Sequence, residues 1–153
     1  MNHESLKTEI QTGPLAVELA PYLDSGNDTA IANVLNEQRG ETMLRERMIN
    51  ARGVMAYYQD GPAAAAIALD KLEAAVAFVP AVKWVMSFLV TDGIDIGSAA
   101  TQAILDQLAA SGLITTDEAS KLKLLGYAPA SRAEIMLGQG VSASDVAIAL
   151  RGQ

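Results

Sequence analysis

The chain has 153 residues, no cysteine, one histidine and a formal net charge of −7 at pH 7. The absence of cysteine excludes a disulfide framework, a thiolate nucleophile and a zinc–sulfur site, and because His3 stands alone near the N-terminus, a histidine-based triad or metal site is excluded as well. The acidic balance argues against a nucleic-acid partner, since affinity for phosphates comes mainly from lysine and arginine.

Half of the residues are hydrophobic, only 5% are aromatic, and 27 are alanine. Alanine has the best helix propensity and is depleted in strands. We therefore predict an all-α fold: one compact domain over residues 1–153, built as a bundle of about seven or eight short helices with a C-terminal α-hairpin. A chain of this length buries roughly 70% of its unfolded surface, which is enough for a sizeable core.

Residues 1–38 are predicted to form short N-terminal helices. The first ends at residues 12–14, where Pro14 suits the first turn of a second helix. Residues 24–26 end that second helix, and Asn27 or Asp28 is expected to cap a third. Apolar residues recur every three or four positions within each of these helices.

Residues 39–60 are the most polar segment, in which four arginines accompany two glutamates. Two apolar pairs, at 43–44 and 48–49, keep helical spacing, so we expect a loop and then an exposed amphipathic helix. Arginine and tyrosine are enriched at interface hot spots, whereas a solvated helix face with i,i+4 ion pairs is the alternative interpretation. The residues predicted as a possible partner contact are Arg39, Arg45, Arg47, Arg52, Tyr57 and Tyr58.

Residues 62–125 are predicted to be the core helices. Pro62 begins one helix that reaches about Phe78, and Pro80 begins another that reaches Val90. Residues 74–90 are the most hydrophobic window, and a membrane span is one interpretation of them. Lys83 near the centre of the window, the interruption by Pro80 and the short length instead favour buried core helices.

The stretch 98–126 is predicted to form an α-hairpin with Gly112 at its turn, and residues 126–153 to form the last helices. A hairpin of this kind could read DNA, but its second helix has two lysines beside acidic residues, which favours a structural role. The predicted capping residues are Ser98, Thr115 with Glu118, Ser131 with Glu134, and Ser142.

The sequence contains no motif for a nucleotide, a metal or another cofactor, and we expect no enzymatic activity. The acidic loops at 92–95 and 24–28 lack the spacing of a calcium-binding loop, so turn and capping roles are favoured. Two of the 18 acidic residues could pair for glycoside chemistry, although no motif selects such a pair. A helical lytic domain is therefore the alternative from the enzyme class.

Two segments are similar to small helical proteins encoded in the structural gene clusters of tailed bacteriophages: LKTEIQTGPLAVELAPYLDSGNDTAIANVLN (residues 6–36) and SRAEIMLGQGVSASDVAIALR (residues 131–151). This resemblance implies a virion or virion-assembly component associated with the tail or the head–tail region. It implies other virion proteins as partners, symmetric homo-oligomeric copies, synthesis in the host cytoplasm and no catalytic residues.

Two further alternatives stay open. An accessory protein that binds a host protein during infection would be found in the infected cell and not in particles, and a membrane-active protein would need detergent for extraction. The N-terminal residues have no apolar h-region, so no secretory signal is expected.

Overall fold

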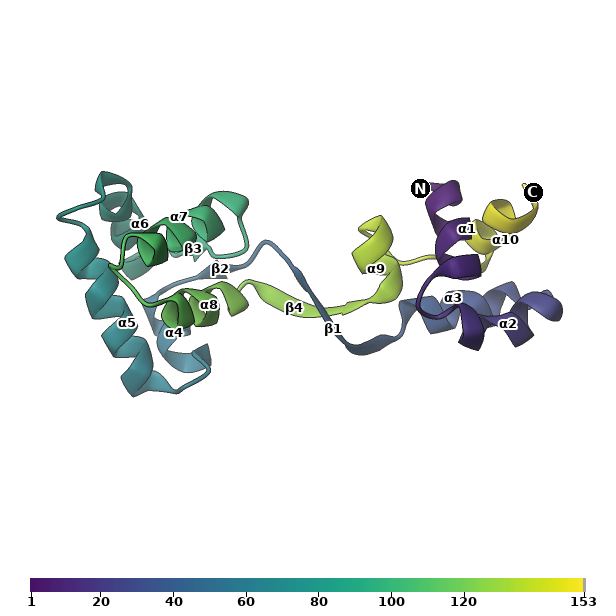
Figure 1. Ribbon diagram of the computed structural model, residues 1–153, viewed down its shortest axis with the longest axis horizontal. Helices are drawn as coiled ribbons and strands as arrows, with labels where there is room; N and C mark the ends of the chain where they lie inside the picture. Colours follow the sequence, from purple (N-terminus) through teal and green to yellow (C-terminus); the bar gives the residue numbers. More distant parts are fainter. Residues whose placement is uncertain (153) are drawn as a thin grey trace. The chain divides into compact units, whose positions relative to one another are not determined.

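The computed structural model describes residues 1–152, which contain ten helices and four short strands (Figure 1). These residues form two compact units. The terminal unit consists of Met1–Met43 and the described residues from Pro129 onward. The central unit consists of Leu44–Ala128. Each unit has its own cluster of buried apolar residues.

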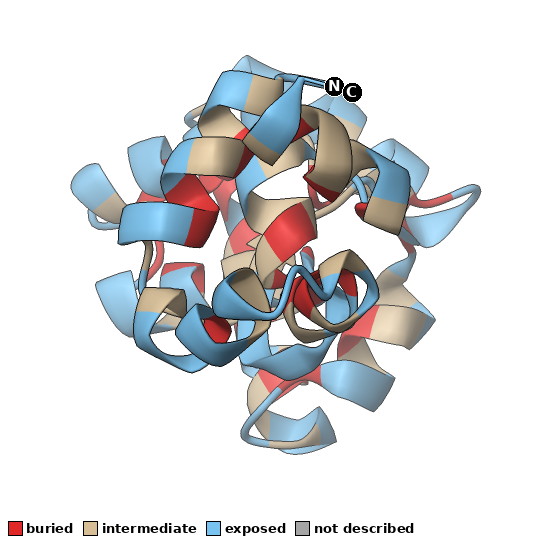
Figure 2. Cartoon of the chain, turned by 90° about the vertical axis from the view of Figure 1, so that its right-hand side faces the viewer, coloured by how far each residue is buried: buried red, intermediate tan, exposed pale blue. Residues whose placement is uncertain are grey.

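The terminal unit is built from helices at both ends of the chain. They are α1 (His3–Thr12), α2 (Ala16–Asp24), α3 (Asp28–Asn36), α9 (Arg132–Leu137) and α10 (Ala143–Arg151). α1 and α3 each pack against α10, and α3 also contacts α9. Buried and exposed residues alternate around these helices in Figure 2, as expected for amphipathic helices. In this unit, the largest fully buried side chains are Leu6, Ile10, Leu19, Ile31, Leu35 and Val146.

Capping residues begin several of these helices as the sequence predicts. The Asn27 side chain accepts a hydrogen bond from the Ala30 N–H at 3.0 Å, at the start of α3. Ser131 and Glu134 form a reciprocal capping box on α9, and Ser142 caps α10. The predicted helix starts are therefore confirmed at these positions.

The central unit contains five helices and one pair of very short strands. The helices are α4 (Ala51–Tyr57), α5 (Pro62–Ala75), α6 (Pro80–Val90), α7 (Ala99–Ala110) and α8 (Thr116–Leu124). The strands β2 (Met48–Ile49) and β3 (Ile94–Asp95) pair antiparallel, with Ile49 opposite Ile94. The core consists mainly of aliphatic and alanine side chains from all five helices, joined by residues outside them such as Ile49, Tyr58 and Ile96.

The predicted α-hairpin is confirmed, since α7 and α8 pack against each other. Ser98 caps α7, and Gly112 occupies the turn with a φ of 71°, a left-handed conformation that favours glycine. Thr115 and Glu118 form the predicted capping box at the start of α8.

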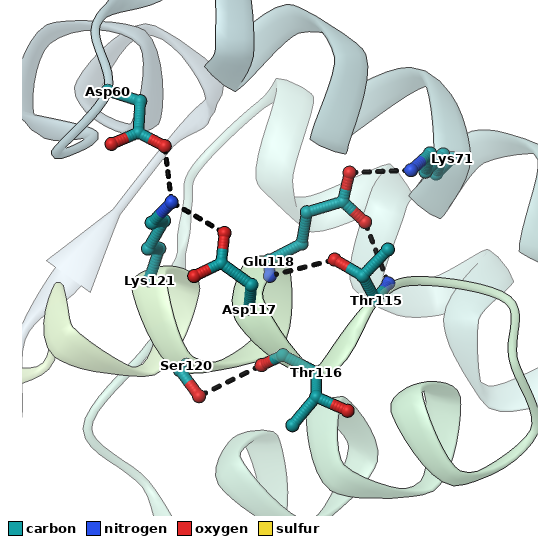
Figure 3. A network of polar contacts seen from close by, with 8 residues as sticks. All are labelled: Asp60, Lys71, Thr115, Thr116, Asp117, Glu118, Ser120 and Lys121. Atoms are coloured by element: carbon teal, nitrogen blue, oxygen red, sulfur yellow. Dashed lines mark hydrogen bonds and ion pairs between the residues drawn. The ribbon is translucent and has the colours of Figure 1, made fainter.

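Polar contacts attach α8 to the rest of the central unit (Figure 3). The Glu118 carboxylate accepts hydrogen bonds from the Thr115 N–H at 2.7 Å and from Lys71 Nζ on α5 at 2.6 Å. Lys121 donates to the carboxylates of Asp117 and Asp60. Glu118 therefore both caps its own helix and joins it to α5.

Replacing Glu118 with alanine should lower the free energy of unfolding of the central unit by about 1–2 kcal/mol, because both the cap and the contact with Lys71 are lost. The matched control is Asp117→Ala, in the same helical turn. Asp117 is exposed and contacts only Lys121, which keeps Asp60, so a markedly smaller loss is expected. Urea unfolding followed by the fluorescence of Trp84 measures both, and equal losses would contradict this role of Glu118.

The same carboxylate makes the central unit sensitive to acid. Burial raises the pKa of Glu118, but the hydrogen bonds from Lys71 and Thr115 outweigh it and hold the pKa below its usual value. A carboxylate whose pKa is lowered on folding stabilises the protein above its unfolded pKa, about 4.3, and this contribution disappears as the pH falls through the folded value. The stability difference between wild type and Glu118→Ala should therefore be constant from pH 7 to about pH 5 and shrink below about pH 4.3. A stability difference that grew on acidification would contradict this role of the Glu118 carboxylate.

The segment from 38 to 49 differs from the prediction. A loop followed by an amphipathic helix was expected, but β1 (Gln38–Leu44) pairs with β4 (Tyr127–Ser131), and residues 48–49 form β2. Only α4, from Ala51, is helical. The backbone groups of this segment bond to residues far away in the sequence: the Arg45 N–H donates to the Gly126 carbonyl at 2.9 Å, and the Arg47 carbonyl accepts from the Ile96 N–H at 3.0 Å. These long-range bonds override the local helical pattern.

The fold class is mainly α rather than strictly all-α. The helices number ten within residues 1–152, more than the expected seven or eight. One hydrophobic core was expected over residues 1–153, with residues 62–125 at its centre. The structure has two clusters, because the apolar stripes of the first three helices pack against the C-terminal helices and not against α5 to α8.

Candidate interaction surface

Helix α6 is apolar on the side that faces solvent as well as on the side that faces the core. Val82 and Leu89 are buried against the central unit. Other apolar residues of α6 and the turn before it are exposed to 72% (Phe78), 63% (Trp84), 51% (Phe88) and 66% (Val90). We call these four residues the α6 surface. A helix at the surface of a soluble protein normally has a polar outer face. The outer face of α6 is apolar, and an apolar face of this kind favours contact with another apolar surface.

The prediction that residues 74–90 are buried core helices is therefore wrong for the burial of ten of these 17 residues, which are exposed. The sequence pattern identifies the segment as the most apolar one, but the central unit covers only one side of α6. No helix within residues 1–152 is long and apolar enough to cross a membrane.

The exposed aromatic area of the α6 surface is comparable to the largest apolar patch of a typical monomer. Aromatic side chains each contribute roughly 150–250 Å² when fully buried, so the exposed parts of these three aromatic residues amount to roughly 300–450 Å² before Val90 is added. The largest apolar patch on a typical monomer covers about 300–600 Å² and is often functional. This size indicates a contact surface.

An open cleft of about 660 Å³ adjoins the α6 surface, between the end of α5 and α6. It has one charged residue from each helix, Glu73 and Lys83, and its other lining residues are apolar or small. Lys83 Nζ lies 5.8 Å from the centroid of the Trp84 ring, so its charge stays close to the aromatic surface. The residues that line the cleft are Glu73, Ala74, Val76, Ala77, Lys83, Met86, Ser87 and Val90.

No protein-family model matches the chain, and neither a curated protein nor a solved structure shows significant similarity to it. The evidence for a functional role of the α6 surface is therefore its own composition, exposure and charge. The sequence marks the α6 surface by its aromatic residues. Six phenylalanine, tryptophan and tyrosine residues lie outside the terminal unit, and three of them, Phe78, Trp84 and Phe88, lie within one short apolar window.

The six residues predicted as a partner contact lie in different environments. Arg39 belongs to the terminal unit, where its guanidinium binds the carboxylates of Glu18 and Glu37. The ion pair with Glu18 raises the pKa of Arg39 and lowers the pKa of Glu18. The other five belong to the central unit.

Within the central unit, Arg47 and Tyr58 have structural roles. The Arg47 guanidinium donates to the Leu125 carbonyl at 3.0 Å and lies 5.1 Å from the centroid of the Tyr57 ring. Tyr58 is buried in the core, and burial raises the pKa of its hydroxyl. Arg45 is half-buried, which leaves Arg52 and Tyr57 as exposed side chains of α4. A partner contact by these exposed residues stays a prediction.

One acidic residue from each of the two acidic loops makes a contact within its own unit. Asp95 Oδ1 accepts hydrogen bonds from the Arg47 N–H at 2.8 Å and the Gly97 N–H at 3.0 Å. Asp28, in the first turn of α3, binds Arg151 of α10. Among residues 1–152, no group of three or more acidic or histidine side chains is arranged to hold a metal ion.

Proposed function

We propose that this chain is a non-enzymatic assembly protein that acts through protein–protein contacts made by the α6 surface. The observation that carries the proposal is the exposure of Phe78, Trp84, Phe88 and Val90 on a single helix and the turn before it. Aromatic residues are the side chains that most often dominate binding energy at protein interfaces. The cleft beside them is lined mainly by apolar and small side chains, which suits a protein surface better than a polar substrate.

We further propose that the assembly is the virion of a tailed bacteriophage, with the chain as a structural or accessory protein at the tail or the head–tail region. This proposal rests on the resemblance to phage proteins inferred from the sequence of residues 6–36 and 131–151. The terminal unit supports this proposal, because the two segments supply the core residues of one folded unit, although about 95 residues separate them. The partners would be other virion proteins, and the chain would be made in the host cytoplasm.

Mass spectrometry of purified particles tests the virion proposal. Particles of a phage that encodes the chain should contain it in a fixed ratio to the major structural proteins. Particles assembled with Phe88→Ser should contain at least about tenfold less, because the contact surface loses one of its aromatic anchors. The matched control is Val17→Ser, which removes an apolar residue that is 89% exposed on α2 of the terminal unit.

Three results would contradict the proposal. The chain could be absent from particles but present in infected cells, which is the behaviour of a protein that binds a host factor. Its incorporation could be unaffected by Phe88→Ser, which would separate the α6 surface from assembly. The purified chain could reduce the turbidity of a peptidoglycan suspension and lose this activity on substitution of one carboxylate, which would identify a lytic enzyme.

A further inference from the structure

We propose that the α6 surface binds a second copy of this chain, in an antiparallel pair of α6 helices related by a two-fold axis. This inference rests on the proposed function only in taking the α6 surface as a contact surface. It adds the identity of the partner, the direction of the helices and the residues that meet.

The exposed aromatic area supplies roughly half of one side of a dimer interface. A stable interface of standard size needs about 800 Å² from each partner. The aromatic residues of the α6 surface supply roughly 300–450 Å² of this area, and Val90 and the residues lining the adjoining cleft lie beside them. The apolar centre and the polar rim of Glu73 and Lys83 follow the usual arrangement of protein interfaces.

An antiparallel arrangement pairs the aromatic residues. In a two-fold interface, residue i of one copy meets residue j of the other, and j meets i. Trp84 and Phe88 are four residues apart, so they lie on the same side of α6. With the axis at the level of residue 86 along the helix, on the side of α6 that carries Trp84 and Phe88, each Trp84 faces Phe88 of the other copy. This gives two aromatic pairs from one contact.

The charges of the cleft are self-complementary. Glu73 and Lys83 line the same cleft with opposite charges, and neither forms an ion pair within residues 1–152. A two-fold axis across α6 brings the cleft side of one copy toward the cleft side of the other. Lys83 can then approach Glu73 of the second copy, and the reciprocal pair forms at the same time.

The charge distribution also favours association through the central unit. The terminal unit has four lysines and arginines against nine acidic residues, whereas the central unit has seven against nine. Helix α6 itself contains Lys83 and no acidic residue. Two copies of an acidic chain therefore repel each other least where their α6 helices meet.

Sedimentation equilibrium and fluorescence of the full chain test the proposal. Wild type should sediment as a dimer, and the emission of Trp84, the one tryptophan in the sequence, should move to shorter wavelength as the protein concentration rises. Phe88→Ser should weaken the dimer at least about tenfold, and Val17→Ser should leave it unchanged. Far-ultraviolet circular dichroism shows that each variant keeps its helices.

Charge reversal tests the direction of the helices. Lys83→Glu should weaken the dimer about tenfold, because each cleft then presents two acidic residues to the other copy. Adding Glu73→Lys to Lys83→Glu exchanges the two charges and should restore most of the affinity. Without this restoration, the antiparallel pairing is incorrect.

Other results would overturn the proposal as a whole. These are a monomer at every concentration, a dimer that Phe88→Ser leaves intact, and a shift of Trp84 emission that needs phosphatidylglycerol vesicles instead of a second copy. The proposed function can be contradicted independently of the dimer. A monomer that enters particles through the α6 surface contradicts only the dimer, and a dimer that is absent from particles contradicts only the virion role.

Discussion

Replacing Arg132 with methionine is expected to destabilise the terminal unit by about 3–5 kcal/mol, because it leaves the Glu9 carboxylate buried without its partner. Glu9, on α1, is 6% exposed, and it accepts hydrogen bonds from Arg132 Nε at 2.6 Å and from a terminal guanidinium nitrogen at 3.2 Å. The hydrogen bond to Glu9 raises the pKa of Arg132, so the guanidinium stays charged at neutral pH.

Hydrogen exchange measured by mass spectrometry is the suitable readout, because it reports on each unit separately. With Arg132→Met, amides of α1 and α10 should exchange much faster, whereas those of α7 and α8 should keep their rates. Arg39→Met is the matched control, since Arg39 binds two exposed carboxylates in the same unit and its loss should have a much smaller effect.

A second substitution separates the buried charge from the lost contact. Combining Arg132→Met with Glu9→Gln removes the carboxylate charge and should recover a large part of the stability lost in Arg132→Met. No recovery, or an effect of Arg132→Met as small as that of Arg39→Met, would show that burial of the Glu9 charge does not determine the stability of this unit.

Gly97→Ala should cost the central unit about 3 kcal/mol or more, because there is no space for a side chain at this position. A Cβ atom on Gly97 would lie 1.7 Å from the backbone carbonyl oxygen of Arg45 and 2.5 Å from its carbonyl carbon. The neighbouring backbone is held in place, since Ile96 donates to the Arg47 carbonyl at 3.0 Å and Arg45 donates to the Gly126 carbonyl at 2.9 Å. Relief of the collision therefore requires these backbone hydrogen bonds to lengthen or break.

Gly112→Ala is the control for Gly97→Ala. Gly112 has a φ of 71° and no atom within 4 Å of its Cβ position, so alanine there meets only the conformational cost, about 1–2 kcal/mol. Urea unfolding followed by Trp84 fluorescence measures both variants. Equal losses in the free energy of unfolding would contradict the close approach of residues 45–47 to Gly97.

Local features of the fold are predictable from the sequence. The capping boxes at Thr115 and Ser131, the turn at Gly112 and the α7–α8 hairpin depend on residues three or four positions apart, and they are present as expected. Features that depend on distant residues are not predictable in this way. The pairing of β1 with β4 and the contact between Glu9 and Arg132, 123 residues apart, leave no periodic pattern in the sequence.

The candidate site was predictable in part. Composition identifies residues 74–90 as the most apolar window, but periodicity does not show which side of Pro80–Val90 remains uncovered, because both sides are apolar. The arginine-rich segment was predicted as a contact for its composition. In the structure, Arg39 pairs with Glu18 and Arg47 donates to the Leu125 carbonyl, each within its own unit. A partner contact by this segment stays a prediction.

The α6 surface is expected to be covered by another protein chain in the assembled state. Since the sequence has no cysteine, Ser87→Cys places a single thiol on α6, and its reaction with a maleimide can be followed in the free chain and in purified particles. Fast labelling of the free, diluted chain and at least about tenfold slower labelling in particles are expected, with Ser25→Cys on the terminal unit as the reference. Equally fast labelling of the Ser87→Cys variant in both states would show that the α6 surface stays uncovered.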